Sequence, residues 1–341
     1  MRVHIERIDT TAASEALLTK LAGLYDALDA EDLPGDPPTP TRKRIVDWRM
    51  AFTRFPIQRW VLQVDGAIVA AAVSRYDVEE NLENATGRIA VHPDHRGKGY
   101  ARRLATPLFD HLEENGRTRL DTWITKGAPA ELLAGRLGLE PVLGERRSRL
   151  LLEEVDFDLM RRWIDRATER AADYTLLAMD APYPEAALDK FCTMMQIMNT
   201  APLEDYEMEE EHITPENWRD IEASVLQGQN QIHNLTAVHR PTGEFVGYTQ
   251  LKTQGLQPDL AWQWDTGVHP DHRNKGLGRW LKAAMVMKVA TEHPEVKRID
   301  TENAGSNEPM LNINLAMGFK PIHEAGVWQG DLATARASLG G

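Results

Sequence analysis

The feature that most constrains the fold is an internal repeat of nine residues. The sequence V-H-P-D-H-R-G-K-G at residues 91–99 recurs at residues 268–276 as V-H-P-D-H-R-N-K-G, with eight of nine positions identical. The offset of 177 residues lies within the usual length range of one domain. A chain of 341 residues can also bury two separate cores. The repeat therefore predicts two copies of one domain.

Other landmarks recur at nearly the same spacing. The segment L-G-L-E-P at residues 137–141 is matched by M-G-F-K-P at residues 317–321. Before each copy of the repeat, residues 60–73 and residues 234–251 have the pattern of a strand, a turn and a second strand. The two halves are therefore expected to contain the same elements in the same order.

We place the junction near residues 153–154, which gives an N-terminal domain at residues 1–152 and a C-terminal domain at residues 153–341. Beyond the junction, residues 157–172 and 185–198 have the spacing of amphipathic helices. The expected fold class is α/β, with two tandem domains.

Charge and composition exclude several function classes. The net charge of −13 repels phosphate backbones, so we expect no nucleic-acid partner, and it suits a cationic small molecule. No run approaches the about 20 apolar residues of a membrane span. With Cys192 as the single cysteine and no apolar leader pattern at the start, a cytoplasmic location is expected. The acidic residues 204–211 are expected to be a solvated surface.

The repeated segment has the pattern of an anion-binding loop. In the second copy an apolar strand at residues 262–268 precedes a basic turn at residues 273–278, and a helix follows. The start of a helix offers unpaired backbone N–H groups and the positive end of the helix dipole. Glycines allow a ligand to approach the backbone, and basic side chains add charge. The turn therefore predicts a pyrophosphate-binding site.

This pattern of Arg-x-x-Gly-x-Gly/Ala resembles the pyrophosphate loop of the GCN5-related N-acetyltransferase (GNAT) family. The first copy reads R-G-K-G-Y-A at residues 96–101 and the second R-N-K-G-L-G at residues 273–278. Residues 307–319 resemble the family's signature Asn-x-x-Ala-x-x-Leu-Tyr-x-x-x-Gly-Phe. Residues 263–266, 293–296 and 303–321 are similar to tandem acetyltransferases of actinobacteria. The resemblance covers nearly the whole chain.

The resemblance implies that each domain has a mixed, splayed β-sheet flanked by helices. Acetyl-CoA (coenzyme A) would lie between two parallel strands, and no metal would be required. The cofactor-binding residues that the resemblance implies are Thr266, Gly267, Val268, Arg273, Asn274, Lys275, Gly276, Leu277, Gly278, Arg279, Asn303 and Asn307 in the second copy, and Val91, Arg96, Gly97, Lys98, Gly99, Tyr100 and Ala101 in the first.

The two copies differ at positions that matter to this chemistry. Asn307 and Asn314 of the second copy are matched by Gly127 and Ala134 in the first, which lack the amide groups. Pro107 falls inside the first motif helix and is expected to kink it. We therefore expect the N-terminal domain to be degenerate or non-catalytic, and the C-terminal domain to be catalytic.

Acyl transfer to an amine needs a base, a polarised carbonyl and close approach. The backbone N–H of Val268 is the expected polarising group, and Asp265 the expected general base, with Asp300 and Glu302 as second choices. The family usually has a Tyr at the position of Asn314, as general acid. Asn314 can donate only a hydrogen bond to developing charge.

Two further patterns have competing interpretations. The His-x-x-His pairs at residues 92–95 and 269–272 could suggest metal ligands, but a structural role in the loops is favoured and no metal site is expected. Trp262 and Trp264 share one strand face and could line an acceptor pocket.

The function predicted is an acetyl-CoA-dependent N-acetyltransferase that transfers an acetyl group to a primary amine of a small molecule, a metabolite or antibiotic, by direct attack. The alternatives are a protein or peptide N-acetyltransferase and a non-catalytic acyl-CoA-binding sensor. The sequence does not fix the acceptor, the acyl-chain length or the oligomeric state.

Overall fold

The structure, a computed structural model, describes residues 2–339 and contains two compact units. Unit 1 consists of the chain up to Glu145, the short segment Leu203–Glu209 and the chain from His323 onward. Unit 2 consists of Arg146–Pro202 and Glu210–Ile322. Two segments from the second half of the chain therefore complete the first unit.

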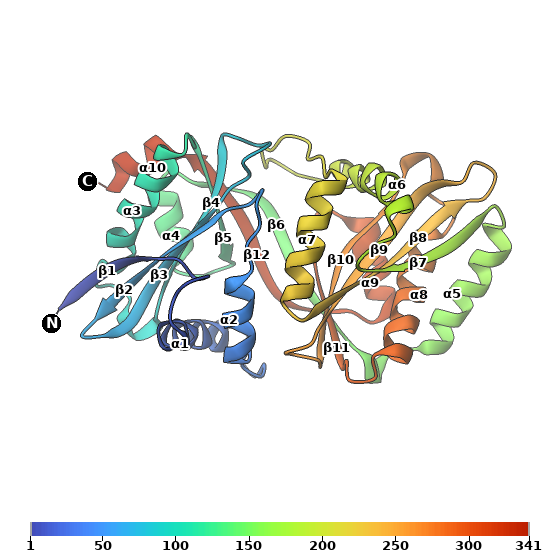
Figure 1. Cartoon of the computed structure of the whole chain (residues 1–341), viewed down its shortest axis with the longest axis horizontal. Helices are drawn as coiled ribbons and strands as arrows, with labels where there is room; N and C mark the ends of the chain where they lie inside the picture. The colour runs from blue at the N-terminus through green and yellow to red at the C-terminus, as the bar shows by residue number, and fades with distance from the viewer. Residues whose placement is uncertain (1, 340–341) are drawn as a thin grey trace. The chain divides into compact units, whose positions relative to one another are not determined.

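Unit 1 has a mixed sheet with the strand order β1-β2-β3-β4-β5-β12 (Figure 1). Only the β4–β5 pair is parallel, and the other pairs are antiparallel. Its elements are β1 (Val3–Ile8), α1 (Glu15–Asp32), α2 (Thr41–Arg49), β2 (Ile57–Val64), β3 (Ala67–Arg75), β4 (Asn84–Val91), α3 (Tyr100–Glu114), β5 (Arg119–Thr125), α4 (Ala130–Arg136), β12 (Lys320–Asp331) and α10 (Leu332–Leu339).

Unit 2 repeats this plan with the strand order β6-β11-β10-β9-β8-β7, in which β10 and β11 are the parallel pair. Its elements are β6 (Glu140–Leu151), α5 (Phe157–Arg170), β7 (Tyr174–Asp180), α6 (Glu185–Met195), the 3-10 helix η3 (Gln196–Thr200), α7 (Pro215–Gln227), β8 (Asn230–His239), β9 (Glu244–Gln254), β10 (Leu260–Val268), α8 (Leu277–Glu292), β11 (Arg298–Ala304) and α9 (Glu308–Met317). The predicted pair of mixed sheets flanked by helices is confirmed.

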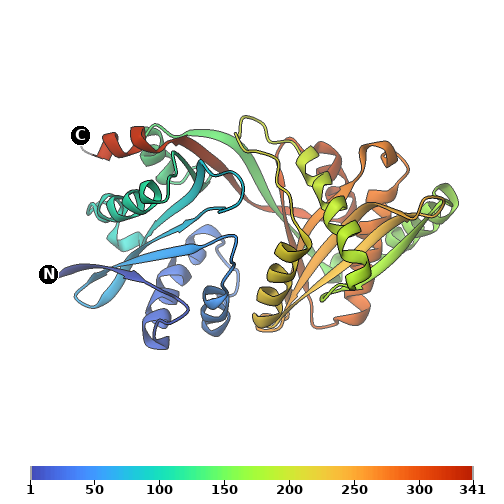
Figure 2. The same ribbon diagram turned by 45° about the horizontal axis from the view of Figure 1, so that its top comes forward.

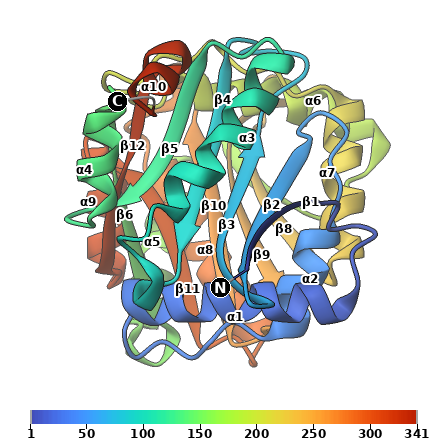
Figure 3. The ribbon, with the colours of Figure 1, turned by 90° about the vertical axis from the view of Figure 1, so that its left-hand side faces the viewer.

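Side chains of the unit 1 sheet alternate between two cores. Leu62 and Leu120 point to the side of α3, where they join Leu104, whereas Val61 joins Leu24 of α1 on the opposite face. Helix α3 packs against β3 and β4 on its side (Figure 3). Because both faces are covered, these strands are apolar on both faces.

The last strand and helix of the chain belong to unit 1. β12 pairs with β5 from Ala325 to Asp331 and leads directly into α10 at the C-terminus (Figure 2). Leu332 and Ala335 of α10 are 1% and 0% exposed and lie in the same core as Leu104. In unit 2, the strand beside β11 is β6, which comes from the middle of the chain. The last strand of each unit's order therefore follows the other unit's loop and helix in sequence. β12 of unit 1 follows α8, and β6 of unit 2 follows α3.

The acidic residues 204–211 are not simply a solvated surface. Tyr206 donates a hydrogen bond to Asp121 at 3.0 Å, and Glu207 forms an ion pair with Arg119 at 2.7 Å. Burial raises the pKa of Asp121 to about 6, although hydrogen bonds from Gln329 and Tyr206 oppose the shift. The segment Leu203–Glu209 is therefore docked within unit 1, where its three glutamates and its one tyrosine have partners.

Helix boundaries agree with local chemistry. Thr214 caps α7 and forms a capping box with Asn217, with Pro215 at the first helical position. Helix α3 runs unbroken from Tyr100 to Glu114 through Pro107. Pro107 is the eighth residue of this helix, where it removes one backbone donor but does not end the helix.

We predict that Leu332→Ala lowers the free energy of unfolding of unit 1 by about 2–5 kcal/mol, the usual cost of emptying a buried leucine site. Hydrogen exchange should accelerate in residues 84–125 and not in residues 298–304. Leu315→Ala is the control, because Leu315 is 54% exposed. Equal effects of the two variants on urea unfolding would mean that α10 does not support this core.

Candidate functional site

Both copies of the repeat form the same loop between a strand and a helix. A 3-10 turn, η1 (Pro93–His95) in unit 1 and η4 (Pro270–His272) in unit 2, follows the strand. Nδ1 of His92 accepts a hydrogen bond from the backbone N–H two residues on at 3.3 Å, and Nδ1 of His269 does the same at 3.3 Å. These histidines cap their turns, which confirms a structural role. Among residues 2–339, no group of three His, Cys, Asp or Glu side chains could hold a metal ion.

The one position that differs between the nine-residue copies keeps its backbone conformation. Gly97 has a φ of +74° and Asn274 a φ of +64°, both in the left-handed region. Asparagine is one of the few residues that enter this region at low cost. Gly99 and Gly276 have φ of +74° and +84°, and a Cβ added at either would meet no atom within 4 Å. The loops are therefore open on the side where their glycines lie.

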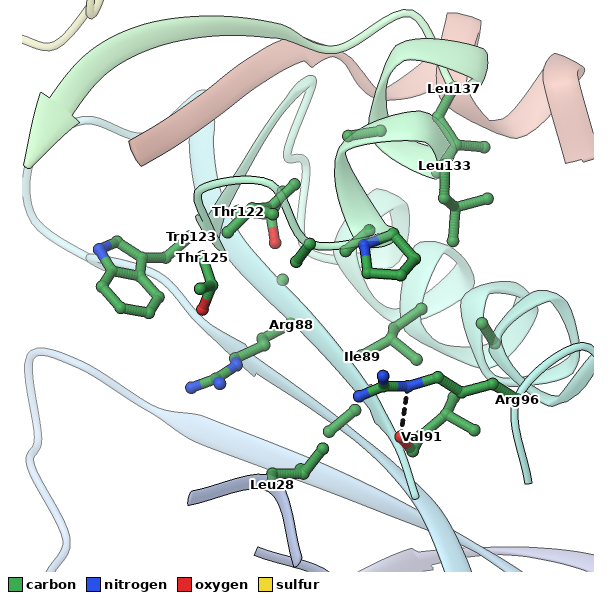
Figure 4. A pocket seen from close by; sticks show the side chains of 18 of the residues that line it. Leu28, Arg88, Ile89, Val91, Arg96, Thr122, Trp123, Thr125, Leu133 and Leu137 are labelled. Atoms are coloured by element: carbon green, nitrogen blue, oxygen red, sulfur yellow. Dashed lines mark hydrogen bonds between the residues drawn. The ribbon is translucent and has the colours of Figure 1, made fainter. Parts of the chain in front are cut away.

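Helices α3 and α8 begin directly after these glycines, and no side chain caps either helix. The N–H groups of each first turn therefore lack helical partners and carry the positive end of the dipole. Arg96 Nε donates to the carbonyl of Val91 at 3.4 Å, and Arg273 Nε donates to the carbonyl of Val268 at 3.0 Å (Figure 4, for Arg96). Each loop is thus fixed to its strand and presents an anion-binding helix start.

Basic side chains of the unit 2 loop rest on aromatic rings. Lys275 Nζ donates to the hydroxyl of Tyr174 at 2.8 Å, and the guanidinium of Arg279 lies 5.2 Å from the centroid of the Trp163 ring. Leu277 is buried at the first position of the helix. These contacts hold two positive charges beside the helix start.

In each unit the two parallel strands part beyond a short paired segment. The β4–β5 register ends at Thr86 and Asp121, and the β10–β11 register ends at Gln263 and Thr301. Residues 87–91 and 264–268 continue past the end of this pairing, so one edge of each strand faces a gap. This gap is the predicted splay of the sheet.

The backbone of Val268 is directed into that gap. Val268 lies opposite Gly247 on β9, and the hydrogen bond to Val246 comes from His269 N–H at 2.8 Å. In an antiparallel pair, the residue between such bonds turns its own N–H to the other edge of the strand. His92 donates to Val69 at 2.9 Å, which directs the N–H of Val91 into the gap of unit 1 in the same way.

β10 contains a β-bulge that β4 lacks. The β9–β10 register shifts between Gln263 and Thr266, whereas the β3–β4 register has no shift. Hydrogen bonds brace the bulge, because Thr266 Oγ1 lies 2.7 Å from Thr249 Oγ1 and Gln263 Nε2 donates to Thr249 Oγ1 at 3.0 Å. A bulge sets two residues of one strand opposite a single residue of its partner and re-aims their side chains. Here these are Trp264 and Asp265.

Asp265 is a carboxylate in apolar surroundings. Its Oδ2 lies 3.5 Å from the hydroxyl of Tyr248, a fully buried residue. Burial raises the pKa of Asp265 above the usual range for aspartate, although the Tyr248 hydroxyl opposes the shift. A raised pKa makes a carboxylate a better proton acceptor near neutral pH. The predicted base therefore has suitable electrostatics.

The second-choice bases have other environments. Asp300 is fully buried, and its oxygens pair with Arg147 and Arg149 of β6 at 2.7 Å each. Both oxygens of Asp300 are therefore already engaged by guanidinium groups, and the carboxylate is not free to face an acceptor. Glu302 is exposed. The Arg147 guanidinium also lies 4.4 Å from the centroid of Trp262, so this ring packs on β6 residues.

The predicted asparagines lie on α9, at its N-cap and at the end of β11 before it. Asn314 is 2% exposed and its Nδ2 donates to Asn303 Oδ1 at 2.7 Å, while its own Oδ1 has no partner among the described residues. Asn307 caps α9 by accepting from Met310 N–H at 3.3 Å. Gly278 approaches the same helix, since an added Cβ would lie 3.4 Å from Ile313.

The matching positions of unit 1 have lost this amide chemistry. Gly127 has a φ of +77°, and its N–H donates to Glu131 at 3.0 Å. Ala134 is buried at 4% exposure. Helix α4 is nevertheless formed, so the loss changes the chemistry of the site and not its scaffold.

Unit 1 contains a cavity of about 550 Å³ at its strand gap. It opens through the sheet, because its walls come from both faces of β4 and β5 as well as from the loop (Figure 4). The predicted cofactor residues in the wall are Val91, Arg96, Gly97, Gly99, Tyr100 and Ala101. Other wall residues lie outside the predicted set, namely Glu31, Asp32, Arg88, Trp123 and Thr125.

These residues carried one signal in the sequence. Arg88 stands 177 positions before Asp265, the offset of the repeat, so an arginine replaces the predicted base. Glu31 and Asp32 end a helix far from any motif, and only the fold brings them to the gap.

No helix among the residues that the structure describes is long and apolar enough to cross a membrane.

Comparison with known proteins gives the family. The acetyltransferase (GNAT) family model matches residues 21–138 and 193–319. No curated protein matches the chain. Among solved structures, a tandem GNAT protein from the clavulanic acid biosynthesis pathway is 22% identical with a TM-score of 0.78, over 97% of this chain and 99% of that one. A GCN5-related N-acetyltransferase from Sphaerobacter thermophilus is 16% identical with a TM-score of 0.68, over 96% of each chain.

These structural likenesses show the same tandem fold, and the family model covers both copies of the loop and of the strand gap. The chain therefore belongs to the acetyltransferase (GNAT) family and is an N-acyltransferase with two tandem domains.

Proposed function

We propose that this protein transfers the acetyl group of acetyl-CoA to a primary amine of a small molecule by direct attack, and that unit 2 carries the reaction. The observation that carries the proposal is the combination, on the single strand β10, of a half-buried carboxylate with a raised pKa and a backbone N–H turned into the gap. Unit 1 has an arginine, Arg88, in place of that carboxylate.

The residues present fit acetyl-CoA. Gly276 leaves open space where a side chain would begin, and the first turn of α8 has unpaired N–H groups suited to a diphosphate. The edge of β10 from Thr266 to Val268 offers a run of backbone groups suited to the amides of a pantetheine arm. The Oδ1 of the buried Asn314 is an acceptor that has no partner within residues 2–339.

Bound acetyl-CoA would supply a thioester, which an amine can attack without a covalent enzyme intermediate. The carboxylate of Asp265 accepts a proton from the amine, directly or through water. The N–H of Val268 donates to the oxygen that gains charge during attack. One N–H of Asn314 is used by Asn303, and the other is left for the departing sulfur.

A small acceptor is favoured over a protein because the face of β10 that carries Asp265 is covered. A Cβ at Gly267 would lie 3.0 Å from Ile197 and 3.4 Å from Met198 of η3. Tyr248 and the buried Trp218 belong to the same core cluster as Ile197. A wall of this kind suits a compact amine better than an extended peptide. The buried free thiol of Cys192 agrees with the reducing cytoplasm that we infer as the location.

A second function is supported for unit 1 by its own site. It keeps the loop, the gap and a cavity of about 550 Å³, yet it lacks the carboxylate and both asparagines of the second copy. We infer that unit 1 binds acyl-CoA without transferring the acyl group.

We expect isothermal titration to give two acetyl-CoA sites per chain. Gly276→Glu should remove one site and all turnover, because its carboxylate repels the diphosphate, and Gly99→Glu should remove the other site alone. Gly276→Asn and Gly99→Asn are matched controls, since asparagine tolerates a positive φ, as Asn274 does. Loss of turnover in Gly99→Glu alone would move catalysis to unit 1.

We predict that Asp265→Asn lowers kcat/KM by about 10²–10⁴-fold, the usual worth of a general base. Because only the deprotonated carboxylate accepts a proton, kcat/KM of the native protein should rise with pH through the raised pKa of Asp265, above the ordinary aspartate value of about 4. The variant should lose this rise. Asp165→Asn, at an exposed position of α5, is the control for charge. A variant that keeps the native pH profile would exclude Asp265 as the base.

A further inference from the structure

The cavity of unit 1 has two differently built faces. Alternation along β4 turns Ile89 and Val91 toward the α3 core and Ala90 toward the α1 core. Arg88 shares the face of Ala90. On β5, the hydroxyl of Thr125 donates to Asp32 of α1 at 3.2 Å, which places the alternate residue Trp123 on this same face. Arg88 and Trp123 therefore enter the cavity from the α1 side of the sheet, opposite to α3 and its N-terminus.

Arg88 is a cation without a counter-ion. Among the described residues it makes no hydrogen bond and no ion pair, and its guanidinium carbon lies 5.9 Å from the centroid of the Trp123 ring. The side chain is half-buried in the cavity wall and extends into the gap beside Trp123 (Figure 4). An arginine in such a position usually meets a carboxylate or a phosphate.

The carboxylates of this face are already engaged with other groups. Glu31 accepts from Arg96 at 2.7 Å, Asp32 accepts from Thr125, and Glu145 accepts from the indole N–H of Trp123 at 2.5 Å. Each of these three carboxylates thus accepts a hydrogen bond from a group other than Arg88. This leaves the positive charge of Arg88 for a ligand.

The cavity also contains polar atoms that packing alone does not explain. The Tyr100 hydroxyl is buried in the wall, at 3% exposure of the residue, and has no partner among the described residues. His95 Nδ1 in the same wall is buried and unpartnered as well. Buried polar groups without partners are costly unless a ligand or water pairs them. The cavity is therefore a site for a molecule and not a gap in the packing.

We propose that the α1 face of the unit 1 cavity binds a small carboxylic acid, with its carboxylate on the Arg88 guanidinium and its apolar body against Trp123. The planar guanidinium matches a carboxylate through two parallel hydrogen bonds. The ring of Trp123 is kept in place by its bond to Glu145 and by stacking on His323, with centroids 5.4 Å apart. This binding does not depend on the transferase reaction proposed for unit 2.

The comparison of the two units supports the assignment. The residue at the matching position of unit 2 is Asp265, so the two gaps carry opposite charges at one point of the repeat. A site with a carboxylate suits an ammonium group, and a site with an unpaired arginine suits an anion. The two units are therefore expected to select different molecules.

The test is isothermal titration of the full chain with benzoate, with benzamide as the neutral molecule of the same shape. Benzoate should bind in the millimolar range or tighter, and Arg88→Met should weaken it by at least about tenfold, the worth of a hydrogen bond to a charged group. Arg88→Lys, which keeps the charge and loses the fork, should fall between. Arg166→Met removes an exposed charge on α5 and should change nothing.

The second arm separates this site from the cofactor site. Acetyl-CoA titration should be unaffected by Arg88→Met, whereas Gly99→Glu should remove the unit 1 cofactor site. The proposal is overturned if benzamide binds as well as benzoate, or if benzoate does not bind at millimolar concentration. It is also overturned if Arg166→Met acts like Arg88→Met, or if Arg88→Met weakens acetyl-CoA as Gly99→Glu does.

Discussion

The parting of two parallel strands is the constraint on which the rest of each unit depends. A buried strand must pair its N–H and C=O groups with something. Beyond Thr86 in β4 and Gln263 in β10 the parallel neighbour is gone, so one edge of each strand is left open. The helix start that follows adds further unpaired N–H groups. Such a row of donors and acceptors is stable only with water or a ligand along it, and this is why the loop and the gap occur together in both units.

In each unit a strand from a distant part of the chain pairs with the strand on the far side of the gap: β12 lies beside β5, and β6 lies beside β11. β5 pairs with β4 only over Arg119 to Asp121, but it pairs with β12 over its whole length, from Arg119 to Thr125. The position of β5 is therefore set by β12, on the side away from the gap. A carboxylate at the same position of the repeat, Asp121 on β5 and Asp300 on β11, bonds to this neighbouring strand in each unit. Asp121 accepts from Gln329 of β12 at 2.9 Å, and Asp300 pairs with two arginines of β6. The edges of β5 and β11 that face away from the gaps thus carry the hydrogen bonds that the edges at the gaps lack.

Local backbone chemistry was predictable from the sequence, and long-range pairing was not. The repeat predicted both loops, because a glycine pattern of this kind demands positive φ at Gly99 and Gly276. The hydrophobic pattern of a strand does not determine which strand pairs with it, so the pairing of β12 with β5 could not be predicted. The acidic run that docks Tyr206 on Asp121 looked like surface for the same reason. Arg88 was visible in the sequence, but its lack of a partner is a property of the fold.

The charge and the backbone at the acceptor face changed together between the two copies. In β10 the bulge re-aims Trp264 and Asp265, and the Asp265 carboxylate lies 3.5 Å from the Tyr248 hydroxyl. In β4 the register is regular, and a long arginine reaches the gap without a bulge. A change of residue type alone would put an aspartate on the regular strand β4, or an arginine on the bulge of β10. The coupled difference is what the two proposed ligands of opposite charge would require, on a scaffold that both copies share.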